Sequence, residues 1–259
     1  MTVGRLDNLT DRILVGTSEL YTTTTTVIIG AGSGCLLVDP AVTPADIAEL
    51  VADLRRLGLH VVAGFSTHPH WDHVLWSADL GTAPRYATAA AVRALAADFS
   101  RSMRLAEESA PGHDAALFGR LTALTAGKTS IKWNGPEVRV IEHRAHAPGH
   151  AALHVPSEGV LLVGDMCSDI EIPLLDTQAA DPVADYRGAL ELFAAADGVR
   201  HVIPGHGSVG DGAELRRRIA ADRRYLDALE SGGGSDDPRL TEDWLIEAHR
   251  AHLQSVYSG

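Results

Sequence analysis

The run His-Pro-His-Trp-Asp-His at residues 68–73 constrains this chain more than any other part of it. It directly follows an apolar segment, residues 61–67, which predicts a buried strand that runs into a loop. Imidazole nitrogens and carboxylate oxygens are the ligands that zinc and its neighbours in the first transition row take. Open α/β folds carry their active sites at the carboxyl ends of strands. The run therefore predicts a metal site at a strand end, rather than a polar surface loop that happens to be rich in histidine.

The spacing within this run favours two metal ions over one. His68 and His70 lie two residues apart, so they point to the same side of an extended chain. Asp72 and His73 are adjacent and point away from each other, so a single ion cannot easily reach all four side chains. We therefore expect His68 and His70 on one ion, and Asp72 and His73 on another.

Other strand ends and turns supply the ligands that one loop cannot. His150 ends the turn Ala-Pro-Gly-His, Asp165 ends an apolar run, and His206 follows a Pro-Gly pair. Glycine lets the backbone bend tightly and approach a site closely, and proline fixes the direction of approach. We expect these three side chains to help complete the two coordination spheres.

These motifs, in this order, resemble those of the metallo-β-lactamase superfamily of hydrolases: His-x-His-x-Asp-His, Pro-Gly-His, Gly-Asp and Pro-Gly-His-Gly. Asp39, which ends the apolar run 35–39, matches the first motif of that family. The resemblance extends from about residue 23 to about residue 208. It implies an α/β (α+β) fold, a four-layer αβ/βα sandwich, with the metals at one edge between two sheets.

The resemblance also assigns a role to each matching residue. It divides the metal ligands into two sets, with His68, His70 and His150 on the first ion and Asp72, His73 and His206 on the second. Asp165 would bridge both ions. Asp39 would orient a ligand through a hydrogen bond, since such outer partners matter nearly as much as ligands. The alternative for Asp39 is a turn residue at a strand end.

The activity that the resemblance implies is hydrolysis. Two divalent ions about 3.5–4 Å apart share a water and lower its pKa from about 16 to near 7, so hydroxide is available at neutral pH. We expect zinc, with manganese or iron as alternatives, because the same ligands accept all three. Asp72 or Asp165 would carry a proton to the leaving group. Asp rather than Cys at position 165 favours the lactonase and glyoxalase II branches over the plasmid-type β-lactamases.

The expected substrate is an ester, thioester or lactone of a small, uncharged or apolar metabolite. No basic cluster for glutathione is evident near the C-terminus. Three alternatives stay open: a persulfide dioxygenase with one iron, held by His68, His70 or His150 and a carboxylate; a phosphodiesterase; and a metal-binding protein without catalysis. The complete ligand set weighs against the last, because degenerate members of the family usually lose ligands.

Charge and composition indicate which classes of partner and which cellular compartment to expect. The net charge is −12, and the only basic cluster, residues 216–218 with 223–224, has acidic neighbours, so we expect no nucleic-acid partner. No apolar run approaches the ~20 residues that span a bilayer, and the N-terminus has no apolar signal core. Two cysteines without such a signal predict a reduced, cytoplasmic protein. The excess of Arg over Lys and the richness in Ala predict a bacterial source.

We expect one domain over residues 1–259. Residues 88–127 are rich in Ala and predict a helical insert, broken near 110–112, that walls the substrate pocket. Its candidates for an apolar lining are Phe99, Met103, Leu105, Leu117 and Phe118, each of which could instead pack on the domain. A flexible linker at 231–238 leads to a C-terminal helix at 240–256. That helix would cap the pocket, dock on its own domain or pack in a homodimer.

Hydrophobic periodicity and turn residues place the other elements. Strands are expected at 11–17, 23–29, 35–39, 60–66, 129–133, 137–142, 151–155 and 160–164, and helices at 44–57, 182–196 and 212–230. The helix at 44–57 has the strongest signals, with Thr43 as its cap, Pro44 in its first turn and Gly58 at its end. Its buried face is expected to comprise Ile47, Leu50, Val51, Leu54 and Leu57.

Several polar or reactive side chains near the motifs have a structural alternative. Four histidines, His143, His146, His154 and His201, are expected either to pack or to support the ligands. His249 and His252 are not expected to bind metal. Cys35 is expected to pack inside a strand, and Cys167 either packs or approaches the metals.

Overall fold

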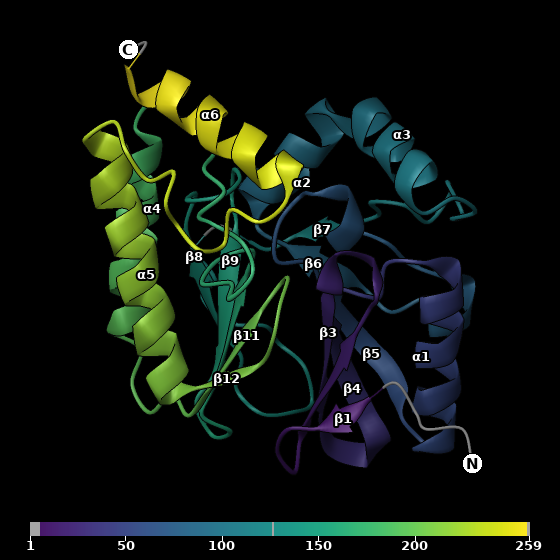
Figure 1. Ribbon diagram of the computed structural model, residues 1–259. Helices are drawn as coiled ribbons and strands as arrows, with labels where there is room; N and C mark the ends of the chain where they lie inside the picture. The colour runs from purple at the N-terminus through teal and green to yellow at the C-terminus, as the bar shows by residue number, and fades with distance from the viewer. Residues whose placement is uncertain (1–5, 126, 258–259) are drawn as a thin grey trace.

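The computed structural model describes residues 6–125 and 127–257, and it contains two β-sheets (Figure 1). The first sheet has seven strands that neighbour one another in chain order: β1 (Asp7–Asn8), β2 (Ile13–Thr17), β3 (Thr24–Ile29), β4 (Gly34–Val38), β5 (His60–Phe65), β6 (Arg85–Ala87) and β7 (Thr122–Ala123). Strands β1 to β4 pair antiparallel, whereas β4 to β7 pair parallel.

The second sheet comes from the later part of the chain. Its five strands are, in spatial order, β12 (Gly210–Asp211), β11 (His201–Pro204), β10 (Val160–Gly164), β9 (Ala151–Val155) and β8 (Arg139–Glu142). Only β10 and β11 pair parallel. The strand expected at 129–133 does not form, because Ser130 makes only an isolated bridge to Arg139.

Helices cover the outer faces of both sheets. They are α1 (Pro44–Arg56), α2 (Ala89–Ala97), α3 (Phe99–Ser109), α4 (Pro182–Ala194), α5 (Gly212–Glu230) and α6 (Asp243–Tyr257). Figure 1 shows the layers in order, with α4 and α5 outside the second sheet and α1 outside the first. This is the αβ/βα sandwich that the sequence motifs predicted. None of the helices in the described part of the chain is long and apolar enough to cross a membrane.

Alternation along the strands explains the layering, because successive side chains of a strand face opposite sides of its sheet. In β4, Cys35 and Leu37 pack with the helix α1, while Leu36 packs in the core between the sheets. In β10, Leu161 packs toward α4 and α5, while Leu162 packs between the sheets. Both strands are therefore apolar along their whole length, as is typical of strands covered on both faces.

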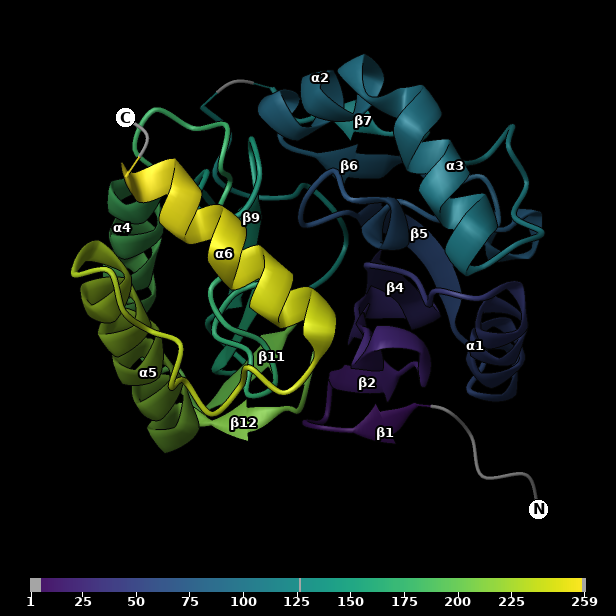
Figure 2. The same cartoon turned by 45° about the horizontal axis from the view of Figure 1, so that its top comes forward.

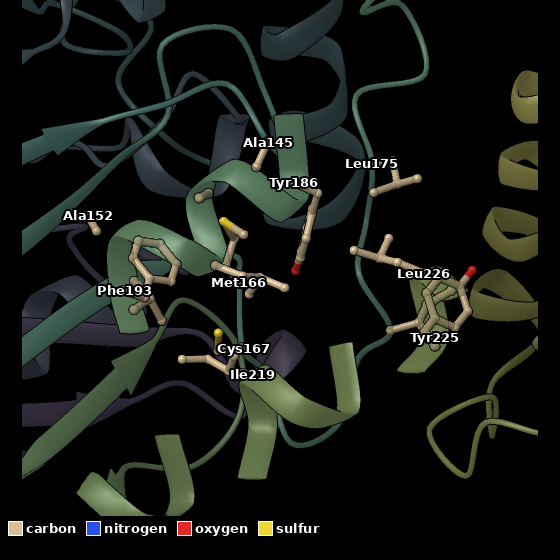
Figure 3. Packing of buried hydrophobic residues seen from close by; sticks show 14 of the residues in the cluster. Ala145, Ala152, Met166, Cys167, Leu175, Tyr186, Phe193, Ile219, Tyr225 and Leu226 are labelled. Atoms are coloured by element: carbon tan, nitrogen blue, oxygen red, sulfur yellow. The ribbon is translucent and has the colours of Figure 1, made fainter. Parts of the chain in front are cut away.

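The core under α4 and α5 also buries Cys167, which settles one open alternative. Figure 3 shows Met166, Cys167 and Ile219 close together within this core. Cys167 is fully buried, and burial raises the pKa of its thiol well above the usual value. Cys167 therefore packs in the core and is not one of the side chains that surround the metal-ligand groups.

Local sequence signals fix the helix ends. Thr43 accepts a hydrogen bond from the Asp46 N–H at 3.0 Å, and Asp46 accepts one from the Thr43 N–H at 3.2 Å, so α1 starts with a capping box. The predicted buried face is confirmed except at its last position. Leu57 lies at the C-terminal cap and is 42% exposed, and Leu59 packs against that core instead.

The region 88–127 is helical only in its first half. The helices α2 and α3 end at Ser109, and residues 110–121 form turns before β7 extends the first sheet. Figure 2 shows α2 and α3 along one side of the molecule and α6 crossing the end of the two sheets. Residues 231–238 form the turns that lead from α5 to α6.

Candidate metal centre

The candidate ligands lie where strands end, at one edge of the sandwich. The loop after β5 carries His68, the loop after β10 starts with Asp165, and the turn after β11 carries His206. The strands β4, β5, β10 and β11 meet as parallel pairs within their sheets, so their carboxyl ends point to the same edge. Asp39 directly follows β4 and reaches the same place.

Two glycines allow the close approach of these loops. A β-carbon at Gly205 would collide with the carboxylate of Asp165, and one at Gly164 would collide with the ring of His150. Gly164 also has a φ of +54°, a conformation that other residues rarely adopt. The Gly-Asp and Pro-Gly-His-Gly patterns therefore report real packing constraints at this edge.

The first group of potential ligand atoms contains three imidazoles and a carboxylate. These atoms, one each from His68, His70, His146 and Asp165, all lie within 4.8 Å of one another. His68 Nε2 is 3.2 Å from Asp165 Oδ2, and His146 Nε2 is 3.4 Å from the same oxygen. His70 Nδ1 lies 3.0 Å from His146 Nε2. The group could hold one metal ion.

The second group contains Asp72, His73 and His206, whose ligand atoms also lie within 4.8 Å of one another. His206 Nε2 is 3.3 Å from Asp72 Oδ2 and 3.3 Å from His73 Nε2. Both imidazoles also approach the carboxylate of Asp165, His73 at 3.2 Å and His206 at 3.3 Å. Asp165 thus lies between the two groups, where a bridging ligand would lie.

His150 does not join either group, which differs from the sequence prediction. Its Nδ1 lies 3.2 Å from His143 Nε2, and its Nε2 accepts the backbone N–H of Asp165 at 3.3 Å. Both ring nitrogens are therefore engaged outside the ligand groups, and His150 supports the backbone of Asp165. His146 takes the predicted place, four positions earlier in the chain.

In three of these imidazoles, the ring nitrogen that faces away from the site contacts an oxygen. His146 Nδ1 donates to Leu174 O at 2.8 Å, and His206 Nδ1 donates to Tyr21 O at 2.9 Å. His68 Nδ1 lies 3.0 Å from the Thr67 hydroxyl. Placing the proton on Nδ1 leaves the lone pair of Nε2 directed into the site, which is the form that binds a metal.

Asp39 supports two of these imidazoles at once. Its carboxylate lies 3.0 Å from His73 Nδ1 and accepts hydrogen bonds from the Thr67 N–H at 2.8 Å and the Thr67 hydroxyl at 2.6 Å. The Thr67 hydroxyl in turn contacts His68, so Asp39 acts on both ligand groups. Asp39 adopts a φ of +45°, which is uncommon outside glycine and typical of functional sites.

Burial and charge set the protonation of the site. Burial lowers the pKa of His146 to about 4 and the pKa of His68 well below its usual value, so both rings are neutral. Burial also acts to lower the pKa of His73, but the charges of Asp165 and Asp72 outweigh it and raise that pKa. Burial would raise the pKa of Asp72, but the charge of His73 outweighs it, so this carboxylate stays ionised.

The residues fit divalent metal ions. Neutral imidazoles and ionised carboxylates are the ligands that zinc, manganese and iron accept. His68 Nε2 and Asp165 Oδ1 are buried and have no hydrogen-bond partner, although buried polar atoms are almost always paired. A metal ion at each group would pair these atoms.

An open cleft of about 640 Å³ leads to the two groups. Its walls come from segments far apart in the sequence. They are Tyr21 and Trp71; Asp98, which precedes α3, with Arg101, Ser102 and Leu105 of α3; Glu171 and Leu174; and Trp244 of α6. Leu105 alone of the predicted apolar lining reaches the cleft, whereas Phe99 and Phe118 pack edge to face at 5.6 Å. Of the five candidates, the other four therefore do not line the cleft. The helical insert, through α3, and the C-terminal helix α6 both contribute residues to the cleft wall.

The C-terminal histidines lie elsewhere, as expected. The Tyr225 hydroxyl lies 3.0 Å from Nδ1 of both His249 and His252. Arg101 and Glu171 are among the cleft residues that sequence reasoning did not assign to the site. No local signal marks them, because their place at the cleft depends on how the loops and helices pack.

The fold and this edge site define a class, the metal-dependent hydrolases with an αβ/βα sandwich. The chain belongs to the metallo-β-lactamase superfamily, whose family model matches residues 21–206. This confirms the family that the sequence motifs indicated.

Solved structures show the same fold. A metallo-β-lactamase family protein from Thermus thermophilus has a TM-score of 0.71 and 22% identity, over 97% of this chain and 95% of that one. A β-lactamase domain protein from Burkholderia ambifaria has a TM-score of 0.66 and 21% identity, over 87% of this chain and 77% of that one. At these identities the likeness concerns the fold alone.

A hydroxyacylglutathione hydrolase from Synechococcus sp. (strain JA-3-3Ab) is similar in sequence. It is 34% identical over 136 residues, which make up 50% of this chain and 46% of that protein. The match thus spans about half the length of this relative.

Proposed function

We propose that the protein is a dinuclear metallohydrolase that cleaves an ester or thioester bond, including the cyclic ester of a lactone, in a small molecule. The observation that carries the proposal is the position of Asp165. Its carboxylate lies between the two ligand groups and lines the cleft that a substrate would enter.

The ligand assignment follows the two groups. One ion would be held by His68, His70 and His146. The other would be held by Asp72, His73 and His206, and both ions would be held by Asp165. When bound, two divalent ions, zinc in the first place, supply a hydroxide at neutral pH and polarise the carbonyl oxygen of the substrate. The assignment differs from the sequence prediction in one residue, His146 in place of His150.

The chain's own side chains complete the reaction. Asp72 is 7% exposed and lines the cleft, so it is placed to pass a proton to the leaving group. Trp71, Leu174 and Trp244 line the same cleft and would exclude water from the scissile bond. The volume of about 640 Å³ suits a small metabolite, because ligand pockets commonly measure about 300–1,000 Å³.

The relative from Synechococcus supports a thioester or ester as the cleaved bond, since its name describes hydrolysis of an acylated thiol. Asp at position 165, shared between the two groups, agrees with the same branch of the family.

The test combines metal content with a substrate panel. Protein purified without chelator or nickel affinity is analysed by elemental mass spectrometry and then assayed on thioesters, esters, lactones and phosphodiesters. The proposal expects about two equivalents of metal per chain and thioester or ester turnover that chelation abolishes. Asp72→Asn should fold but lose most of its turnover, and its metal content, measured in parallel, separates loss of the second ion from loss of proton transfer. Full activity in Asp72→Asn would exclude the proton-transfer role.

Other outcomes would replace the proposal. A single iron per chain with oxygen uptake on a persulfide would make the protein a dioxygenase. Turnover of phosphodiesters alone would change the bond class. Two bound metals without turnover on any substrate would favour a metal-binding role.

A further inference from the structure

The segment Met166–Glu171 follows the bridging carboxylate, and the proposed chemistry does not use it. It ends at Glu171, which lines the same cleft as the ligand groups and is 7% exposed. The charged groups that act on its carboxyl are those of His206, Asp165, Asp72 and His73. Glu171 therefore lies beside the second ligand group without belonging to it.

The carboxyl of Glu171 has no partner. Its backbone N–H donates to the Ser168 hydroxyl at 3.1 Å, but its side chain makes no hydrogen bond or ion pair with any residue in the ranges 6–125 and 127–257. Arg101 lines the same cleft and forms no ion pair with it. The Glu171 side chain is largely buried in the cleft wall and has no protein partner, so its carboxyl is available to a polar group of a ligand in the cleft.

The backbone that carries Glu171 is held to the turn of His206. The Ser168 hydroxyl donates to His206 O at 2.8 Å and accepts the N–H groups of Ile170 and Glu171, each at 3.1 Å. The carboxylate of Asp169 accepts the Ser208 N–H at 2.8 Å. These bonds tie the position of Glu171 to the second ligand group.

Two buried arginines from the C-terminal part of the chain donate hydrogen bonds to the backbone of the same segment. Arg218 donates to Cys167 O at 3.3 Å, and Arg239 donates to Ser168 O at 3.4 Å. They are 5% and 7% exposed, and Arg239 also pairs with the buried Asp222 at 2.6 Å. Both arginines lie beyond the residues that match the family model. The C-terminal part thus pre-positions a side chain that the shared motifs do not include.

We propose that Glu171 contacts the substrate and accepts a hydrogen bond from an O–H or N–H donor near the scissile carbonyl. This inference rests on the proposed hydrolase function and narrows its substrate class to acyl groups that carry such a donor, as hydroxyacyl and aminoacyl groups do. The backbone of Glu171 is held in place by hydrogen bonds, and its carboxyl lies beside the ligand groups without a protein partner. It is therefore suited to this contact. An acyl group without a donor would leave the carboxyl buried and unpaired.

The experiment compares three thioesters of N-acetylcysteamine: lactoyl with an O–H donor, alanyl with an N–H donor, and propionyl with neither. Wild-type kcat/KM should be about tenfold to a hundredfold higher for at least one donor substrate than for propionyl, as expected for one unpaired buried polar group. Glu171→Leu should remove this preference, and Glu171→Gln, which keeps an acceptor oxygen, should retain part of it. Glu49→Leu, an exposed position on α1, serves as the matched control.

Two further readouts separate a substrate contact from a structural role. Metal content and the thermal midpoint should be unchanged or higher in Glu171→Leu, because no protein partner is lost. Calorimetric binding of the products lactate, alanine and propionate to wild type and Glu171→Leu measures the same contact without turnover. An equal preference in wild type and Glu171→Leu would overturn the inference while leaving the hydrolase function intact.

If wild type cleaves none of these thioesters and no ester or lactone of the wider panel, the proposed function fails, and product binding still decides the role of Glu171. Donor-dependent binding that Glu171→Leu abolishes would then support the contact. Equal binding of products with and without a donor would exclude the contact of Glu171 with the substrate.

Discussion

His146 and His150 lie on the two sides of one Ala-Pro-Gly turn, and the structure gives them different roles. The ring of His146 enters the first ligand group, with Leu174 holding its outer nitrogen. The ring of His150 packs under Gly164 and accepts the N–H of Asp165. At the residue scale, we therefore expect His146 to bind a metal ion and His150 to support the backbone of Asp165.

Substitution of each histidine should separate these roles. His146→Ala removes a ligand, so it should lose about one equivalent of metal and about a hundredfold or more in activity. His150→Ala leaves the Asp165 N–H buried and unpaired, so it should lower the free energy of unfolding by about 1–3 kcal/mol while keeping both metals. Elemental analysis and urea unfolding measure the two effects. Loss of metal from His150→Ala as severe as from His146→Ala would contradict the assignment.

Asp39 offers a second prediction at this scale. Asp39→Asn can keep the positive φ, since Asn tolerates that conformation, but it loses the charge that faces His73. Metal affinity should fall about 10–100-fold, measured by competition with a chromophoric chelator. Asp79→Asn, in a surface pair with Arg55, should leave the affinity unchanged and controls for general loss of charge. Equal affinities in both variants would reduce Asp39 to a turn residue.

At the scale of elements, the helix α6 supports the ligand groups as well as the cleft wall. His252 on α6 accepts the N–H of Leu175 at 3.2 Å, and the preceding Leu174 accepts the proton of His146. The Tyr225 hydroxyl of α5 lies 3.0 Å from His252 Nδ1. A chain of hydrogen bonds thus runs from α5 through α6 to a ligand.

His252→Ala should test this connection. Without its ring, the segment that carries Leu174 loses an anchor, so stability should fall by about 1–3 kcal/mol and the first metal should bind more weakly. Gln254→Ala, an exposed position on the same helix, is the matched control. The midpoint of urea unfolding and a chelator titration give both quantities. Unchanged metal affinity together with lost stability would restrict α6 to packing.

At the scale of the whole molecule, both sheets contribute ligands to one edge, and many imidazoles are buried there. Burial lowers the pKa of His143 to about 3 and the pKa of His252 to about 4. An unfolded histidine titrates near 6.5. Because the unfolded chain binds more protons below pH 6.5, the stability from these neutral rings is present above that pH and is lost as the pH falls toward 4.

The metal-free protein should therefore lose stability between pH 7.5 and pH 5. Each of these two histidines should account for about 2 kcal/mol of the loss at pH 5. Urea unfolding at both pH values, in the presence of a chelator, measures it. His252→Gln should show a smaller loss, whereas His60→Gln, at an exposed position, should behave as wild type. A loss in His252→Gln as large as in wild type would contradict the burial of a neutral imidazole at this position.

Much of the molecule could be read from the sequence because the signals are local. The apolar runs of β4 and β10 and the Thr43–Pro44 start of α1 each depend on a few neighbouring residues. The histidines and carboxylates of residues 68–73, with Asp165 and His206, revealed the family because their chemistry and order are visible without contacts. These features follow from side-chain chemistry and backbone preference alone.

Only the tertiary structure decided which side chains meet. His146 and His150 are alike in sequence, and the packing of the turn against Gly164 and Leu174 determines which ring joins the first group of potential ligand atoms. Glu171 and Trp244 reach the cleft through loops and helices whose positions depend on partners far along the chain. Such contacts join residues with no common local pattern, so the shape and polarity of the cleft appear only when the chain has folded.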